Sequence, residues 1–444
     1  MTRRQFLRWL AASGLAVVLS RRLLSAGGGS GSFAPPPALA GLTVTALTAA
    51  PAGGWCWFNG PSAVHGSGKT YLGYLKGTNG DLCLRTVDDT TLAVSAERVV
   101  YPAFERDDHD APSILVRNSD GHICVAFSLH VGDIYYGEGA SPGALPPAIP
   151  DAAIRNITSS LGGATGWPNV PGYTYAGLAQ VSAVADTLYL FLRWHDAGGT
   201  AHLGYSKSAD NGATWGARVL VNTVTYHQFA VNGSDRIDFV CSPHATADPE
   251  PHSIYHCYFV PSTEKWYQSD GTEITAAKPF AASDMTLVYD GGVGETDAWL
   301  WDIAIDGTGK PVVVYATFPS TSDHRYNYGR WTGSAWVTSE IVAAGTHIPT
   351  SGVEDNYSGG VCLDHADPSY VYASIGLGSD RWDMYRYHTG DGGASWSSVA
   401  LTSSGKNIRP MAVQGHDASL QAIWFEGTYT TYIDYSLRTM GAGV

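Results

Sequence analysis

Residues 122–128 read HICVAFS, a short run of apolar and β-branched residues that follows the turn Asp120-Gly121. Runs of the same kind, rich in Val, Ile, Tyr and Phe and preceded by a turn with Asp or Gly, recur along the chain. The other copies are KTYLGYL (69–75), TLYLFLR (187–193), RIDFVCS (236–242), PVVVYAT (311–317), SYVYASI (369–375) and LQAIWFE (420–426). The seven runs begin between residues 69 and 420, a mean spacing of about 58 residues.

A repeat of this length has room for four short strands, and it slightly exceeds the ~50 residues of the longest common propeller repeat. The composition agrees, because the chain has 52 glycines, 11% aromatic residues and only 15% charged residues, a balance typical of strands and turns. We therefore predict an all-β fold, a seven-bladed β-propeller of four-stranded antiparallel blades.

Two segments match the Asp-box pattern, in which Ser or Thr is followed by Asp, Gly and Trp at fixed spacing. They read SADNGATW (208–215) and TGDGGASW (389–396). We expect the Asp and Gly to shape a tight turn and the Trp to fill space between strands, so the motif is structural.

The first 40 residues differ in composition from the rest of the chain. Arg3 and Arg4 precede an apolar run, residues 9–19, that is too short for a membrane span of ~20 residues. The arginine pair followed by Gln5, Phe6 and Leu7 resembles a twin-arginine export signal, with an ordinary secretory signal as the alternative. We predict a signal and a Gly/Ser/Pro linker in residues 1–40 and one propeller domain in residues 41–444. The protein would be exported to the periplasm or exterior of a bacterium, with no membrane span after signal removal.

The charge balance bears on the partner. The chain has 26 Lys and Arg against 40 Asp and Glu, and five of the arginines lie in the first 40 residues, which leaves a net charge of −19 beyond them. A nucleic-acid partner is excluded, since phosphate binding depends on a surplus of cations.

Propeller geometry suggests where a site lies. In each blade the first strand begins, and the second ends, on the same face. The first strands are expected to begin near Phe58, His109, Tyr175, His227, Trp299, Tyr357 and Arg409. Two second strands end at His130 and Arg193. His109, His130, Tyr175 and Arg193 are therefore predicted to converge as catalytic residues.

These residue types fit β-elimination at a 4-linked uronic acid. Arginine neutralises the C6 carboxylate, while histidine and tyrosine move protons from C5 and to the departing O4. No cofactor is required for this chemistry, and the partner would be an anionic polysaccharide. The candidate substrate-binding residues are Tyr173, His227, Arg325, Tyr357, Arg409 and Trp299.

A metal site is a separate hypothesis. Cys241 and Cys257 flank an expected hairpin, with His244 and His256 nearby, so a disulfide or a structural Zn²⁺ or Ca²⁺ on His244, His256 and Cys257 stays open. No CxxC-type spacing supports it. We read most of the six cysteines as small buried residues.

Several motifs, in order, resemble the BNR-repeat family that includes seven-bladed ulvan lyases. They include GWCWF (54–58), DDHDAPS (107–113), FSLH (127–130) and LYLFLR (188–193). The resemblance implies a propeller whose site uses two histidines, a tyrosine acid/base and an arginine neutraliser, here His109, His130, Tyr175 and Arg193. The residues after Tyr175 depart from the family pattern, so Tyr173 is a competitor for the tyrosine role.

The predicted function is therefore a polysaccharide lyase that cleaves an ulvan-like polysaccharide of rhamnose and uronic acid. One alternative is a glycoside hydrolase of the rhamnosidase or sialidase type. A sialidase would need an arginine triad, for which Arg236, Arg325 and Arg409 are available, and a Tyr/Glu pair. The other alternative is a non-catalytic propeller that stacks sugars on exposed aromatic rings.

Overall fold

The computed structural model describes residues 41–443 except 163–171, 197, 225, 245–251, 293–294, 350–353 and 418. The predicted export signal and linker, residues 1–40, lie outside the described residues. In the described part of the chain, no helix has the length and hydropathy needed to cross a membrane.

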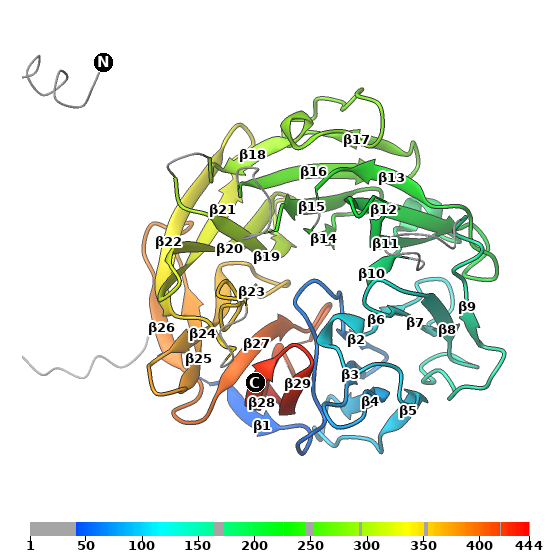
Figure 1. Ribbon diagram of the computed structural model, residues 1–444, viewed down its shortest axis with the longest axis horizontal. Helices are drawn as coiled ribbons and strands as arrows, with labels where there is room; N and C mark the ends of the chain where they lie inside the picture. The colour runs from blue at the N-terminus through cyan, green and yellow to red at the C-terminus, as the bar shows by residue number, and fades with distance from the viewer. Residues whose placement is uncertain are drawn as a thin grey trace, which may run out of the picture. The chain divides into compact units, whose positions relative to one another are not determined.

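Seven antiparallel sheets surround a central axis, so the predicted seven-bladed propeller is confirmed (Figure 1). Blade 1 comprises β2 (Ala63–Gly66), β3 (Lys69–Leu75), β4 (Leu82–Asp88) and β5 (Arg98–Tyr101). Blade 2 comprises β6 (Ser113–Val116), β7 (Ile123–Ser128), β8 (Ile134–Glu138) and β9 (Ile154–Asn156). Blade 3 comprises β10 (Tyr173–Ala179), β11 (Leu188–His195), β12 (Ala201–Ser208) and β13 (Val219–Asn222).

The remaining blades follow the same order from the axis outward. Blade 4 comprises β14 (Tyr226–Val231), β15 (Ile237–Ser242), β16 (Ile254–Val260) and β17 (Lys265–Tyr267), with β18 (Thr286–Tyr289) also paired to β16. Blade 5 comprises β19 (Ala298–Ile305), β20 (Pro311–Ser320), β21 (Asp323–Trp331) and β22 (Trp336–Gly345). Blade 6 comprises β23 (Val361–Leu363), β24 (Tyr370–Gly376), β25 (Trp382–His388) and β26 (Ser397–Ala400).

Blade 7 is built from both ends of the described chain. It comprises β27 (Asn407–Ala412), β28 (Ala422–Thr431), β29 (Asp434–Gly443) and, on the outside, β1 (Thr43–Ala46). β1 pairs antiparallel with β29, from Thr43 opposite Gly443 to Ala46 opposite Met440. This pairing closes the ring and gives the last blade its fourth strand. Three short 3₁₀ turns complete the secondary structure: η1 (Asp108–Asp110), η2 (Ser182–Val184) and η3 (Ala282–Asp284).

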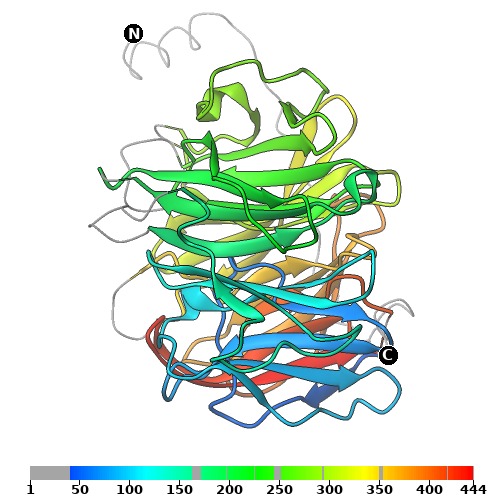
Figure 2. The same ribbon diagram turned by 90° about the vertical axis from the view of Figure 1, so that its right-hand side faces the viewer.

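Each apolar run recognised in the sequence is the second strand of its blade. The side view shows the strands running back and forth between two faces (Figure 2). The second strands are largely buried on both sides because adjacent blades pack against them, which explains their continuous apolar sequence. We call the face on which the innermost strands begin the entry face.

The two Asp-box segments form matching turns. Asp210 accepts hydrogen bonds from the Ser208 hydroxyl and the Thr214 amide, at 2.7 and 2.8 Å. Asp391 accepts the same two bonds from Thr389 and Ser395, at 2.8 and 2.9 Å. The following tryptophans pack edge-on against a tyrosine of the preceding blade: Trp215 on Tyr136 and Trp396 on Tyr328.

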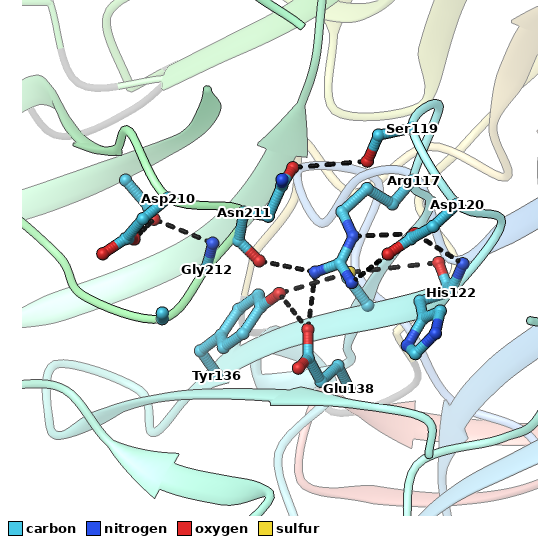
Figure 3. Close-up of polar contacts among 12 residues, drawn as sticks. Arg117, Ser119, Asp120, His122, Tyr136, Glu138, Asp210, Asn211 and Gly212 are labelled. Carbon is cyan, nitrogen blue, oxygen red and sulfur yellow. Dashed lines mark hydrogen bonds and ion pairs between the residues drawn. The ribbon is translucent and has the colours of Figure 1, made fainter. Parts of the chain in front are cut away.

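The turn at Asn211 is also held by an arginine of the neighbouring blade (Figure 3). Arg117 donates from Nη1 to the carbonyl of Asn211 at 2.5 Å and to Glu138 at 2.6 Å. Its Nε and Nη2 donate to both oxygens of Asp120. Because one buried guanidinium joins blade 2 to blade 3, it fixes how these two blades meet.

Replacing Arg117 is expected to destabilise the ring. Arg117→Ala removes charge-assisted hydrogen bonds worth about 1.5–3 kcal/mol each and leaves the Asn211 carbonyl without that donor. We expect a loss of about 2–3 kcal/mol in the free energy of unfolding, measured by denaturant titration.

The matched control is Arg438→Ala, which removes a 42% exposed arginine paired with Glu426 inside one hairpin of blade 7. An exposed pair contributes about 0–1 kcal/mol. Equal losses in the two variants would contradict the role of Arg117 between blades.

Candidate functional site

A single carboxylate orients two histidines on the entry face. Asp107 is the N-cap of η1 and accepts the His109 backbone amide at 3.0 Å. Its Oδ1 lies 2.5 Å from His109 Nδ1, and its Oδ2 lies 2.9 Å from His130 Nδ1. The two imidazole rings stack with centroids 4.1 Å apart and planes 4° apart. Because Nδ1 of each ring faces Asp107, Nε2 is the nitrogen that each ring directs away from it.

The two histidines differ in protonation. Burial lowers the pKa of His109, but the neighbouring carboxylates of Asp107 and Asp108 outweigh it and raise the pKa above its usual value. Burial and the charge of His109 lower the pKa of His130 to about 4. His130 is therefore neutral near neutral pH, whereas its neighbours favour the charged form of His109. His130 is also the more accessible ring, with 28% of its side chain exposed.

Tyr175 reaches this cluster through an irregularity in β10. Its φ is +57°, and the pairing of β10 with β11 shifts register between Thr174 and Gly177. The side chain lies 5.5 Å from His109, measured between ring centroids. Burial raises the pKa of Tyr175 well above its usual value although Arg193 opposes the shift, so the hydroxyl stays protonated.

Arg193 lies against the faces of two tyrosines. Its guanidinium carbon is 4.4 Å from the ring centre of Tyr175 and 5.2 Å from that of Tyr226. The residue is only 4% exposed. Among the described residues, no carboxylate forms an ion pair with Arg193, and its Nε has no hydrogen-bond partner. Tyr226 also forms a side-chain hydrogen bond with Arg193. A buried cation whose described neighbours are tyrosines and not carboxylates is a place for an anion to bind.

A buried ion pair forms the floor beside these groups. Arg409 Nη2 lies 3.4 Å from Asp108 and donates to the Tyr429 hydroxyl at 2.7 Å. Tyr429 in turn donates to Asp108 at 2.9 Å. Cys56 lies next to this pair, and burial raises the pKa of its thiol to about 12. The thiol is therefore neutral. The charges of Arg409 and Asp108 compensate each other, so this ion pair supports the neighbouring residues of the cluster.

Three further residues belong to the site and were not among the predicted ones. Tyr226 packs on Arg193, and the ring of Tyr432 meets His109 edge-on at 5.0 Å. Glu354 is half-buried; burial raises its pKa to about 7, while His109 and Arg409 pull it down. Asp107 is a fourth site residue that the prediction did not include, and the sequence carried a signal for it alone, since it stands two residues before His109.

The other predicted binding residues are distributed differently. Trp299 and Tyr357 are buried beneath the cluster, where Trp299 contacts Tyr226 at 5.2 Å and Tyr357 lies against Arg409. Tyr173 is not brought to the site, because it is packed in the core of blades 2 and 3 and its hydroxyl accepts from Arg218 at 3.0 Å.

His227 and Arg325 are also separate from the cluster. His227 follows Tyr226 on β14, and since side chains alternate along a strand, it is Tyr226 that packs on Arg193 while His227 lies beside Phe239. Arg325 is 38% exposed on β21 and pairs there with Asp323 and Glu340.

The three metal candidates do not converge. His256 and Cys257 are consecutive in β16 and therefore point to opposite sides of the sheet. His256 bonds Asp238 and Ser269, whereas His244 packs on Trp299 near the cluster. Cys241 and Cys257 are free thiols.

Elsewhere in the described chain, three groups place ligand atoms within 4.8 Å of one another: Asp107, His109 and His130; Cys56, Asp108 and His109; His65, Asp89 and Asp417. In the first group each carboxylate oxygen of Asp107 forms a hydrogen bond with a different imidazole ring, so Asp107 orients the two rings.

Comparison with known proteins gives the family. Residues 69–344, more than half of the chain, match the model of the BNR repeat-containing family. The chain belongs to this family. No curated protein matches it.

Among solved structures, an ulvan lyase shares the propeller fold. A polysaccharide lyase PL25 ulvan lyase, solved alone and bound to -[GlcA(1-4)Rha3S]-, has a TM-score of 0.68 at 14% identity. The match covers 89% of this chain and 94% of that one. A Hadza microbial sialidase has a TM-score of 0.42 at 14% identity over 71% of this chain and 63% of its own. At this identity the ulvan lyase shows what the fold is.

The stacked histidines should titrate on opposite sides of the usual value for histidine. We expect His130 to stay neutral down to a pH of about 4 and His109 to keep its proton above pH ~6.5, because Asp107 and Asp108 favour its charged form. Nitrogen-15 NMR of the imidazoles measures both, with His109→Gln and His130→Gln to assign the signals.

Asp107→Asn removes a carboxylate that raises the pKa of both rings, so the pKa of His109 should fall in that variant. In the wild-type protein, titration of both histidines together near pH ~6.5 would contradict the arrangement.

Proposed function

We propose that this protein is a polysaccharide lyase that cleaves a rhamnose- and uronate-containing polysaccharide by β-elimination at a 4-linked uronate. The observation that carries the proposal is the buried guanidinium of Arg193, which lacks a carboxylate partner among the described residues. It lies beside a neutral imidazole and a protonated phenol. Such a set can hold a carboxylate, remove a proton and supply one.

Arg193 would bind the C6 carboxylate of the uronate. Neutralising that carboxylate acidifies the C5 proton, and the guanidinium suits the task because it stays charged and has a planar set of donors. The two tyrosine rings that flank it keep water away and strengthen the interaction.

His130 would accept the C5 proton, since its pKa leaves it neutral near pH 7 and its ring is the more exposed of the pair. Tyr175 would donate its proton to O4 as the C4–O4 bond breaks, since its raised pKa keeps the hydroxyl protonated. The positive charge on His109 and on Arg193 would stabilise the enolate that forms in between. The products are a 4,5-unsaturated uronate and a free O4 hydroxyl, and no metal or redox cofactor takes part.

The likeness in fold to an ulvan lyase bound to -[GlcA(1-4)Rha3S]- supports this substrate class. We also propose, from residues 1–40, that the protein is exported and meets its polysaccharide outside the cytoplasm.

One observation favours a hydrolase instead. Glu354 forms a hydrogen bond with Tyr357, the pair of residue types that a sialidase uses as its nucleophile. However, the three arginines considered for a triad are separated. Arg236 lies beyond the end of β14 on the opposite face, Arg325 is exposed on β21, and Arg409 is buried against Asp108.

The test of the lyase is ultraviolet absorbance of the unsaturated uronate during incubation with ulvan or pectic fragments. Absorbance should rise in step with chain cleavage. Release of sugars without this chromophore would establish a hydrolase, and binding without release would establish a binding protein.

The two tyrosines provide a matched pair of variants. Tyr175→Phe should lower kcat by about 10²- to 10⁴-fold, because it removes the proton donor. Tyr173→Phe should leave kcat unchanged, because its hydroxyl bonds Arg218 away from the cluster. Full activity in both variants would exclude Tyr175 and Tyr173 as the acid.

The pH dependence follows from His130. The base works in its neutral form, which is lost as pH falls through a pKa of about 4, so kcat/KM should stay high between pH ~6.5 and ~5 and fall below. An acid limb centred at pH ~6.5 or above would assign the base to another residue.

A further inference from the structure

A cavity opens on the entry face, between blades 5 and 6. Its volume is about 330 Å³, and it is lined by Ser322, His347, Ser379, Asp380, Arg381 and Trp382 together with Thr346 and three glycines. The register of the strands places it. Ser320 pairs with Asp323, and Gly376 with Trp382, at the ends of hairpins that lie on the side where β19 and β23 begin. The cavity therefore faces the same way as the catalytic cluster.

Backbone conformation keeps the cavity open. Gly345 has a φ of +96°, and a Cβ there would lie 2.9 Å from the Gly376 carbonyl oxygen. Gly376 in turn passes so close to the Trp382 ring that a Cβ would meet it at 3.0 Å. Ser379 and Asp380 both adopt positive φ, 52° and 58°. They are the central residues of the turn that joins β24 to β25, in which the Arg381 amide donates to the Gly378 carbonyl at 3.0 Å, and positive φ at both positions is what a type I′ hairpin turn requires. This turn places Arg381 at the rim of the cavity.

Among the charged side chains that line the cavity, the cation of Arg381 faces solvent. Asp380 is paired at 2.5 Å with Lys406, whose own side chain is 4% exposed, so this acid is neutralised from below. Arg381 is 47% exposed and uses Nη2 for Asp383. A guanidinium carries five N–H donors, so Arg381 can bind a second anion. His347 adds a further nitrogen-bearing ring on the opposite wall.

Lys406 also connects this cavity to the catalytic floor. Its Nζ donates to the Tyr429 carbonyl at 3.3 Å and to the Ile348 carbonyl at 2.8 Å. The hydroxyl of Tyr429 bonds Asp108 and Arg409 beside His109. Blade 7 therefore supports both the cavity and the catalytic cluster.

We infer that this cavity is a distal subsite that binds an acidic sugar residue of the same polysaccharide chain that is cleaved at His130 and Tyr175. The inference rests on the proposed function for the identity of the polymer. Arg381 binds the carboxylate or sulfate of that sugar, and Ser322, Thr346 and Ser379 provide hydroxyl groups for its ring. A long substrate then occupies both places at once, which lowers its dissociation rate.

The test compares a long and a short substrate. In Arg381→Ala and in His347→Ala, kcat/KM on ulvan polymer should fall by about 5- to 20-fold, while kcat/KM on the shortest oligosaccharide that is cleaved stays unchanged. Arg381→Lys keeps the charge and should recover part of the loss, which guards against misfolding. The control is Lys265→Ala, a half-exposed cation paired with Glu273 at the opposite face, and it should leave both substrates unaffected. Equal losses on both substrates, or no loss on either, would overturn the subsite.

Binding measurements separate this inference from the proposed function. In calorimetric titrations with ulvan, with pectic fragments and with neutral dextran, Arg381→Ala should weaken binding of the two acidic polymers. If the wild-type protein binds ulvan through Arg381 but never cleaves it, the lyase proposal fails and the subsite stands. If binding of dextran is weakened equally, the assignment to an acidic sugar is wrong. Desulfated ulvan distinguishes recognition of sulfate from recognition of carboxylate.

Discussion

Closure of the ring by β1 and β29 is the constraint on which the rest of the molecule depends. Without that pair, blade 7 would expose an edge, and the segment that leads into blade 1 would no longer be anchored to blade 7. Once the ring is closed, the seven innermost strands all begin on one face. His109, Tyr175 and Arg409, which are far apart in sequence, are then neighbours because they belong to equivalent places in different blades.

The catalytic cluster shows how the fold handles charge without water. Asp107 is stabilised by two imidazoles, and Asp108 by Arg409 and Tyr429. These pairs balance within the protein, so each is a structural element of the floor. Arg193 differs, because tyrosine faces are its neighbours and a guanidinium in that setting gains most when an anion arrives. The cluster is thus preorganised for one negative charge, which in the proposed function is the uronate carboxylate.

Much of the fold could be predicted from the sequence, because the signal is repeated seven times. HICVAFS and its six counterparts form the second strands of the blades and are buried on both sides. Each therefore has a continuous apolar sequence that can be recognised in every blade. The meeting of His109, His130, Tyr175 and Arg193 also follows from strand polarity alone. What strand polarity cannot give is the direction of an individual side chain.

Residues in β10 and β14 show why. Strict alternation would place Tyr173 and Tyr175 on the same side, but the positive φ of Tyr175 and the register shift after Thr174 separate them. On β14, Tyr226 packs on Arg193 and His227 does not. The two residues are consecutive, so their side chains point to opposite faces of the sheet. Glu354 enters the site from a connection between blades, where no periodicity exists to place it.

The net charge of the chain and the placement of charged residues at the entry face have opposite effects on a polyanion. A protein with a net charge of −19 beyond residue 40 repels a polyanion at long range, yet at the entry face the acids Asp107, Asp108 and Asp380 are each held by a cation or imidazole. Salt screens long-range repulsion within about 10 Å at 0.1 M, whereas a buried pair with Arg193 is screened much less. In the proposed function, short-range contacts therefore decide binding. The polyanion would be held where a guanidinium keeps unused donors, at Arg193 and, through the donors that Asp383 does not take, at Arg381.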